Sequence, residues 1–246
     1  MGLYLDGFLI ALKGAPVTIG VSLIAVALGV CLGLSLALLK MSKHFILRLP
    51  ATIYVEIVRG TPIVVQAFIF AYGIPQLLQA NGVPFKWAQL IIPAVIVCSL
   101  NSAAYVAEVI RSGLQAVDKG QMEAARSLGM SHAMSMRLII IPQAFRIILP
   151  ALGNEFVTLI KETSVLSFVG VIEIMRKGTL WNAATFETFP AYIGVACAYM
   201  VLTIPLSRLV NYVEHRMAVD KKDNVPKSST LDAGEAATML PRKDMV

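Results

Sequence analysis

Residues 14–39 read GAPVTIGVSLIAVALGVCLGLSLALL and contain no charged side chain. About 20 apolar residues in a helix cross a hydrocarbon core of about 30 Å, so this run is long enough to span a membrane. Further uncharged runs extend from Gly60 to Phe85, from Trp87 to Ala107 and from Thr188 to Ser207. Because lipid offers no hydrogen-bonding partner to a peptide group, each run is predicted to be an α-helix.

The composition supports the same fold class. Hydrophobic residues make up 57% of the 246 residues and charged residues only 15%, whereas a soluble domain carries about 25% charged residues. The runs are too long for barrel strands and do not alternate apolar with polar residues. We therefore predict an all-α polytopic membrane protein. Cys31, Cys98 and Cys197 lie in apolar runs without metal-ligand spacing, so we expect small buried residues, with no metal and no cofactor.

The order of apolar and polar segments predicts a five-helix membrane domain over residues 14–216. The domain is expected to follow an exposed extracytoplasmic arm at residues 1–13 and to precede a disordered cytoplasmic tail at residues 217–246. The expected spans are about 14–39, 62–78, 87–107, 143–168 and 188–210. A short helix and loop are expected at 169–187.

Two details concern the approach to the second span. Pro50 is expected to open a connecting segment at 51–59, and Thr61 is expected to cap the span with Pro62 at its first position. Glu56 and Arg59 could bind a substrate or pair with each other, and pairing is the favoured interpretation.

Basic residues near the span ends predict the orientation. With the loop at 108–137 placed in the cytoplasm, nine basic residues lie on that side and four on the other, which predicts the N-terminus outside and the C-terminus inside. The net charge of +6 is explained by these flanking residues and does not require nucleic acid as a partner. The nine are Lys40, Lys43, Arg48, Arg111, Lys119, Arg126, Arg137, Arg208 and Arg216, and the four are Lys13, Lys86, Arg176 and Lys177.

The polar loop is predicted to fold as two short helices separated by a turn. Gly129 suits a left-handed position after the first helix, and Ser131 can cap a second helix at about 132–140. Pro142 is expected to force a bend before the fourth span. Ala124 and Ala125 make a face with little side chain, which another protein could approach closely. Composition alone also allows an ordinary cytoplasmic loop.

The spacing in this loop resembles the EAA coupling loop of permeases of ATP-binding-cassette (ABC) importers. That pattern is E-A-A, three residues, G, nine residues, I, any residue, L, P, and Ile141 stands where leucine is usual. The matching residues are Glu123, Ala124, Ala125, Gly129, Ile139 and Pro142. The segments 56–62, 101–108 and 149–164 are similar to elements of the polar amino acid (histidine, glutamine, glutamate and arginine) permeases, which have a MetI-like transmembrane domain.

This resemblance implies the function and the partners. The chain has no G-x-x-x-x-G-K-[ST] motif, so ATP hydrolysis would reside in two copies of a separate ATPase subunit, which bind the loop at about 118–141. An extracytoplasmic substrate-binding protein and a second permease copy, identical or sibling, complete the expected complex in the bacterial inner membrane. A polar amino acid is the expected substrate, with glutamine slightly favoured. The alternatives are a stand-alone secondary transporter or channel, and a membrane scaffold or sensor.

Polar side chains inside the spans are the candidate substrate pathway, because charged groups cost about 2.5–3.5 kcal/mol in lipid and should face the interior. Two sets share a helix face by spacing, one on the third span and one on the fourth. The other interpretation of these residues, and of Gln66, is hydrogen bonding and ion pairing between helices. The candidates inside the spans are Asn101, Tyr105, Glu155, Thr158 and Glu162, and Arg59, just before the second span, is added to them.

Overall fold

The computed structural model describes residues 2–218, in which helices joined by short connections account for all regular structure. Five segments are long and apolar enough to cross a membrane, which confirms the predicted all-α fold with five spans. The predicted tail lies outside the described residues from position 219 onward. The five segments are Gly2–Lys40, Ile63–Ala80, Ile91–Gln115, His132–Val169 and Thr188–Met217.

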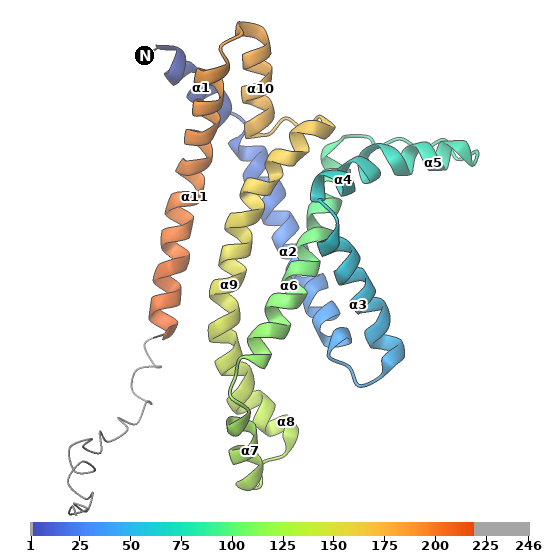
Figure 1. The fold of residues 1–246 in the computed structure, drawn as a ribbon, viewed down its shortest axis with the longest axis vertical. Helices are drawn as coiled ribbons and strands as arrows, with labels where there is room; N and C mark the ends of the chain where they lie inside the picture. Colours follow the sequence, from blue (N-terminus) through green and yellow to red (C-terminus); the bar gives the residue numbers. More distant parts are fainter. Residues whose placement is uncertain (1, 219–246) are drawn as a thin grey trace, which may run out of the picture.

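Three long helices cross near the centre of the molecule (Figure 1). They are α2 (Ala15–Lys40), α6 (Ile91–Gln115) and α9 (Ile141–Glu162). Helix α11 (Thr188–Ala218) packs against α9 on one side, and α3 (Phe45–Gly60) packs against α2 and α6 on the other.

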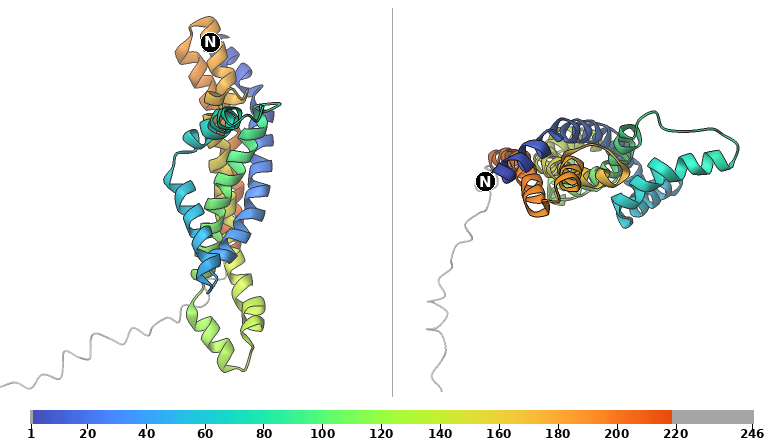
Figure 2. Two further views of the ribbon diagram at one scale, coloured as in Figure 1. Left: turned by 90° about the vertical axis from the view of Figure 1, so that its right-hand side faces the viewer. Right: turned by 90° about the horizontal axis from the view of Figure 1, so that it is seen from above.

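The two ends of this bundle carry different short helices (Figure 1). Helices α7 (Lys119–Ser127) and α8 (His132–Ser135) project beyond the bundle at one end, as Figure 2 also shows. Helices α1 (Gly2–Leu12) and α10 (Ile174–Thr185) lie at the other end, and α10 confirms the short helix expected before the last span.

Close packing of α2 on α6 forms the most extensive contact between two helices. A Cβ atom added to Gly29 would lie 2.6 Å from Ser102 Oγ, and one added to Gly33 would lie 2.7 Å from Val106 Cγ1. The two glycines have the G-x-x-x-G spacing that lets membrane helices approach closely. The G-x-x-x-G spacing in the sequence therefore predicts a close contact of this helix. The sequence analysis considered only the absence of charge in residues 14–39 and did not use this spacing.

The predicted exposed arm at residues 1–13 is wrong, because α1 packs against α10 and α11. Gly7 and Ala11 are buried in these contacts. A Cβ atom added to Gly194 of α11 would lie 2.4 Å from the carbonyl carbon of Gly7, so the two backbones are nearly in contact. Small residues bring the two backbones together, and Phe8 and Leu12 add apolar contacts to the cluster that includes Ile174.

The predicted connecting segment at 51–59 is also wrong, because these residues belong to α3, with Pro50 inside the helix. The helix is interrupted at Thr61. The chain then continues through α4 (Ile63–Phe68), a π-helical turn η1 (Ile69–Gly73) and α5 (Ile74–Ala80). This second part extends sideways from the bundle (Figures 1 and 2). Thr61 does not cap α4 with its side chain; its hydroxyl donates to the carbonyl of Ile57, and Pro62 is the N-cap.

A buried carboxylate joins α10 to the last span. Glu173 is fully buried and accepts hydrogen bonds from the amides of Met175 (2.8 Å) and Arg176 (2.7 Å) and from the Tyr199 hydroxyl (2.7 Å). Burial raises the pKa of the Glu173 carboxyl, although these three hydrogen bonds act in the opposite direction. The carboxylate thus caps α10 at its N-terminus and ties it to α11.

The cysteines only partly match the expectation. Cys98 is buried in α6, as predicted, but Cys31 and Cys197 are exposed on α2 and α11. All three are free thiols. On helices that span a membrane, an exposed side chain can face lipid rather than water, so an apolar thiol can be exposed without contacting water.

Candidate functional site

A cavity of about 500 Å³ lies at the helix interruption between α3 and α4. The break at Thr61 separates the two helices and opens the space beside α6 and the end of α9. The 3-10 turn η3 (Thr163–Val169) completes the wall. The lining residues are Arg59, Gly60, Thr61, Pro62, Ile63, Val64, Asn101, Tyr105, Glu162 and Val165.

The cavity carries one basic and one acidic side chain. The Arg59 guanidinium lies over the ring of Tyr105, 5.3 Å from its centroid, which is a favourable cation–π distance. Glu162, at the end of α9, lines the same space. A site of this kind can offer a cation to a bound carboxylate and an anion to a bound ammonium group.

Glu108 holds Arg59 from behind the cavity. Its carboxylate lies 3.9 Å from Arg59 Nη1, accepts hydrogen bonds from Arg111 Nε (3.1 Å) and Nη2 (2.7 Å), and forms an ion pair with Lys40. These contacts join α2, α3 and α6. The expected pairing of Arg59 with Glu56 is therefore wrong, because within residues 2–218 the acidic partner of Arg59 is Glu108.

Amide side chains bridge the helices on the adjoining wall. Asn101 Nδ2 donates to Gln66 Oε1 (3.1 Å), and Gln66 Nε2 donates to the carbonyl of Val58 (2.8 Å). These bonds link α6, α4 and the last turn of α3. Gln66 therefore matches the alternative interpretation, in which it forms hydrogen bonds between helices. Asn101 forms such a bond too, and it also lines the cavity.

The predicted two-helix loop forms as α7 and α8. Helix α7 starts at the N-cap Asp118, whose carboxylate accepts from the amide of Gly120, and ends in a Schellman motif. In that motif the amide of Met130 donates to Ala125 O and the amide of Gly129 to Arg126 O. Gly129 has φ +83°, the left-handed conformation that the sequence predicted. Ser131 caps α8 by accepting from the amide of Met134, also as predicted.

The two alanines of this loop face in different directions. Ala124 and Glu123 are exposed, whereas Ala125 is buried within the chain. The expected alanine face is therefore shared between an outer surface and the packing of the helix pair. Leu128, at the turn, is 83% exposed and was not singled out from the sequence.

The bend expected at Pro142 takes another form. Helix α8 continues through a π-helical turn η2 (Met136–Ile140) into α9, and Pro142 occupies the first turn of α9. The missing amide of proline costs little at this position, and a π turn accommodates the change of direction within continuous helix.

The sequence matches the family described as binding-protein-dependent transport system inner membrane component over residues 29–219. This chain belongs to that family. The permease is 38% identical over 212 residues to a Rickettsia typhi protein named as the glutamine transport system permease GlnP, covering 86% of the chain and 94% of that relative. It is also 38% identical over 206 residues to the arginine transport system permease protein ArtQ of Bacillus subtilis, covering 84% of the chain and 91% of that relative.

Solved structures agree with this assignment. The permease superposes with a TM-score of 0.77 on a chain of a crystal structure described as an amino acid ABC transporter with histidines, at 42% identity, covering 84% of this chain and 94% of the other. It also superposes with a TM-score of 0.65 on a chain of the MetNI methionine ABC transporter in an inward-facing conformation. That match is at 16% identity, covers 85% of this chain and 96% of the other, and shows the fold alone. The chain is therefore a multi-pass inner-membrane permease of an ABC transporter, not a stand-alone carrier or a scaffold.

The six predicted pathway residues of the permease separate into two groups. Arg59, Asn101, Tyr105 and Glu162 line the cavity. Glu155 and Thr158 lie one to two turns further along α9, toward α7 and α8, and do not line it. Glu155 is half-buried and Thr158 is exposed.

The sequence analysis did not predict that the backbone between α3 and α4 lines the cavity. Residues 60–64 contribute a wall, and the sequence analysis assigned them only to the start of the second span and the residues just before it. The signal that could have found it is Pro62, since the residue before a proline is biased away from helix and the proline offers no amide to the preceding turn.

Proposed function

We propose that the chain is the permease subunit of an ABC importer that carries a polar amino acid, with glutamine as the favoured substrate. The names of the relatives support this substrate class. In this proposal the five-helix domain at residues 14–216 forms the transmembrane pathway. The chain does not hydrolyse ATP, which is the task of separate ATPase subunits.

The observation that carries the proposal is the presence of opposite charges in one cavity. A free amino acid is a zwitterion, so Arg59 would bind its carboxylate and Glu162 its ammonium group. Asn101 and Tyr105 would offer polar groups to an amide side chain. Glu155 and Thr158 would lie on the exit path from the cavity toward the α7 end.

The partners follow from the two ends of the molecule. Two ATPase subunits, one for each of two paired permease copies, would bind α7 and α8 in the cytoplasm. An extracytoplasmic substrate-binding protein would deliver the amino acid at the end that carries α1 and α10. This places the N-terminus outside and the C-terminus inside, and the same end that carries α7 also collects the loop after α2, in agreement with the distribution of basic residues.

Coupling would run through the loop residues that match the EAA pattern. Glu123 and Ala124 present an outer surface, Gly129 sets the turn, and Ala125 packs the helix pair. Pro142 begins α9, which reaches from the loop to Glu162. Movement imposed on α7 by the ATPases would therefore reach the cavity along one continuous helical segment.

The test is uptake of labelled glutamine by the complete transporter in proteoliposomes. Arg59→Gln and Glu162→Gln should each lower uptake at least about tenfold, the equivalent of about 1.4 kcal/mol of lost binding. Glu214→Gln, which removes an exposed carboxylate outside the cavity, should have little effect. Parental uptake by both cavity variants would contradict the proposed site.

A further inference from the structure

The 3-10 helix η3 completes the wall of the cavity and depends on its neighbours for support. It runs for seven residues, whereas poorer hydrogen-bond geometry limits most 3-10 helices to about three or four. Glu162, directly before η3, and Val165, within it, both line the cavity. Leu166 and Val169 pack into the apolar core on one side of η3. The contacts that fix its two ends therefore decide where Glu162 lies.

Tyr199, on α11, contacts the residues at both ends of η3. Its hydroxyl donates to Glu173 Oε2 (2.7 Å), shortly beyond the C-terminal end. It also interacts with the side chain of Thr163, the first residue of η3. Thr163 is fully buried, and its own hydroxyl donates to the carbonyl of Ile160 in α9 (2.7 Å). One phenol of the last span thus joins the segments before and after the 3-10 helix.

Glu173 is itself firmly held. Its carboxylate accepts from the amides of Met175 and Arg176 in the first turn of α10. Its backbone touches α2, because a Cβ atom added to Gly14 would lie 2.4 Å from the carbonyl carbon of Glu173. Glu173 forms no ion pair with residues 2–218, so hydrogen bonds and the N-terminus of α10 compensate its buried charge. Hydrogen bonds to a charged group are roughly twice as strong as those between neutral groups.

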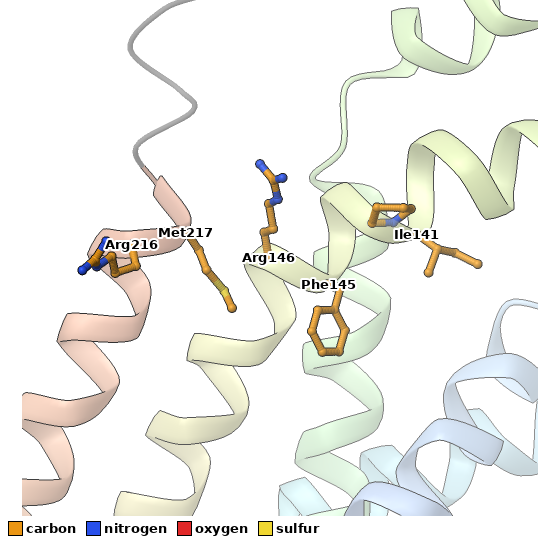
Figure 3. Close-up of a pocket in the computed structure, with 6 residues that line it drawn as sticks. Ile141, Phe145, Arg146, Arg216 and Met217 are labelled. Atoms are coloured by element: carbon orange, nitrogen blue, oxygen red, sulfur yellow. The ribbon is translucent and has the colours of Figure 1, made fainter.

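The helices α9 and α11 are apart at their other ends. At the α7 end a cavity of about 510 Å³ lies between them, and Figure 3 shows Phe145 of α9 and Met217 of α11 at its walls. Closer to η3, a Cβ atom added to Gly153 would lie 2.7 Å from Val210 Cγ2, so the two helices touch there. The hydrogen bonds of Tyr199 therefore fix the end of α9 that carries η3.

We propose that Glu173 and Tyr199 are positioning residues that clamp η3 and thereby hold Glu162 and Val165 at the wall of the cavity. Neither of the two lines the cavity, so both act through η3. Capping of α10 by Glu173 does not require Tyr199, and the contact of Tyr199 with Thr163 is not explained by a cap. The consequence for transport rests on the proposed function of the cavity, whereas the clamp itself does not.

Hydrogen–deuterium exchange tests the clamp without transport. The complete transporter with the full-length permease is reconstituted, and Tyr199→Phe, which removes the hydroxyl and keeps the ring, is compared with the parental chain. Amides of residues 163–171 should exchange about tenfold faster, the effect of losing one hydrogen bond to a charged group, while α2 and α6 exchange at the parental rate.

Tyr192→Phe is the matched control for this measurement. It makes the same change on an exposed tyrosine of the same helix, whose hydroxyl forms no hydrogen bond within residues 2–218. Exchange of residues 163–171 should therefore stay at the parental rate. If Tyr199→Phe does not assemble, Glu173→Gln takes its place. Glutamine has one acceptor oxygen instead of two, so it cannot accept from both Arg176 and Tyr199 as Glu173 does, and exchange of residues 163–171 should again rise.

A double-mutant cycle with Glu162→Gln tests the consequence for transport. Tyr199→Phe should lower glutamine uptake several-fold in the parental chain and by a clearly smaller factor in Glu162→Gln, because the carboxylate that the clamp positions is then absent. A general loss of folded protein would lower both by the same factor. Parental uptake by Glu162→Gln would contradict the proposed substrate site, and the exchange rates would still decide on the clamp.

Three results would overturn the proposal. They are equal exchange of residues 163–171 in Tyr199→Phe and Tyr192→Phe, a uniform rise of exchange across all spans in Tyr199→Phe, and loss of uptake by the same factor in both backgrounds of the cycle.

Discussion

Gly129 acts through its backbone rather than through a side chain. Its φ of +83° closes the turn between α7 and α8, and no atom lies within 4 Å of the position a Cβ would take. A larger side chain at position 129 would therefore meet no steric clash within the described residues, and only the backbone conformation favours glycine. An L residue other than glycine, asparagine or aspartate pays roughly 1–2 kcal/mol in this region.

We expect Gly129→Val to uncouple transport from ATP hydrolysis, because valine favours another backbone conformation and would reorient α7 against α8. The measurement compares ATPase activity and glutamine uptake of the reconstituted complex. Gly129→Asn is the matched control, since asparagine tolerates the left-handed region, and it should retain most of the uptake. Uptake by Gly129→Val at the parental rate would remove the turn from the coupling mechanism.

The contact between α2 and α6 belongs to the scale of whole elements. Gly29 and Gly33 face Ser102 and Val106 so closely that a methyl group has no room. Helices in lipid gain little from burying apolar surface against each other, so the van der Waals contact and the close approach of backbones carry the association. This explains why glycines, rather than large apolar residues, mark the most extensive interface in the bundle.

Gly33→Ala should lower the stability of the folded permease by about 1–3 kcal/mol, the usual cost of overpacking. Thermal unfolding in detergent, followed by the loss of monodisperse protein, measures the change. Gly20→Ala in the same helix is the control, because nothing lies within 4 Å of its added Cβ. If Gly33→Ala instead raises the stability as much as Gly20→Ala does, the gain in helix propensity outweighs any crowding against α6, and the packing argument is wrong.

At the scale of the whole molecule, the described residues have two ends with different character. One end carries α7, α8 and the loop after α2, and the other carries α1 and α10. The helix ends that carry most of the basic residues near the spans lie at the first end, so topology and charge distribution agree on which parts share a side of the membrane.

Cysteine accessibility tests this orientation. In a chain whose Cys31, Cys98 and Cys197 are replaced by alanine, a membrane-impermeant maleimide should label Thr185→Cys in right-side-out vesicles but not Ser131→Cys. Inverted vesicles should give the opposite pattern. Both target positions are exposed, so burial does not limit the reaction. Labelling of Ser131→Cys from the outside would reverse the proposed topology and with it the place of the ATPases.

The candidate site was only partly accessible from the sequence. Helical spacing predicted that Asn101 and Tyr105 share a face, and the cost of charge in lipid pointed to Glu162. These residues line the cavity, and so does Arg59, which the sequence placed in the connecting segment before the second span. Spacing within one helix could not reveal that Glu155 and Thr158 lie outside the cavity. That depends on where the break at Thr61 opens space beside α9.

The amino-acid sequence alone was sufficient for the membrane fold, the five spans and the turn at Gly129, because these depend on local chemistry: the cost of charge in lipid and the conformational preference of single residues. Tertiary structure decided which distant residues meet. The pairing of Arg59 with Glu108 and the docking of α1 on α11 arise from contacts between segments far apart in the chain. No periodicity within one segment records such contacts.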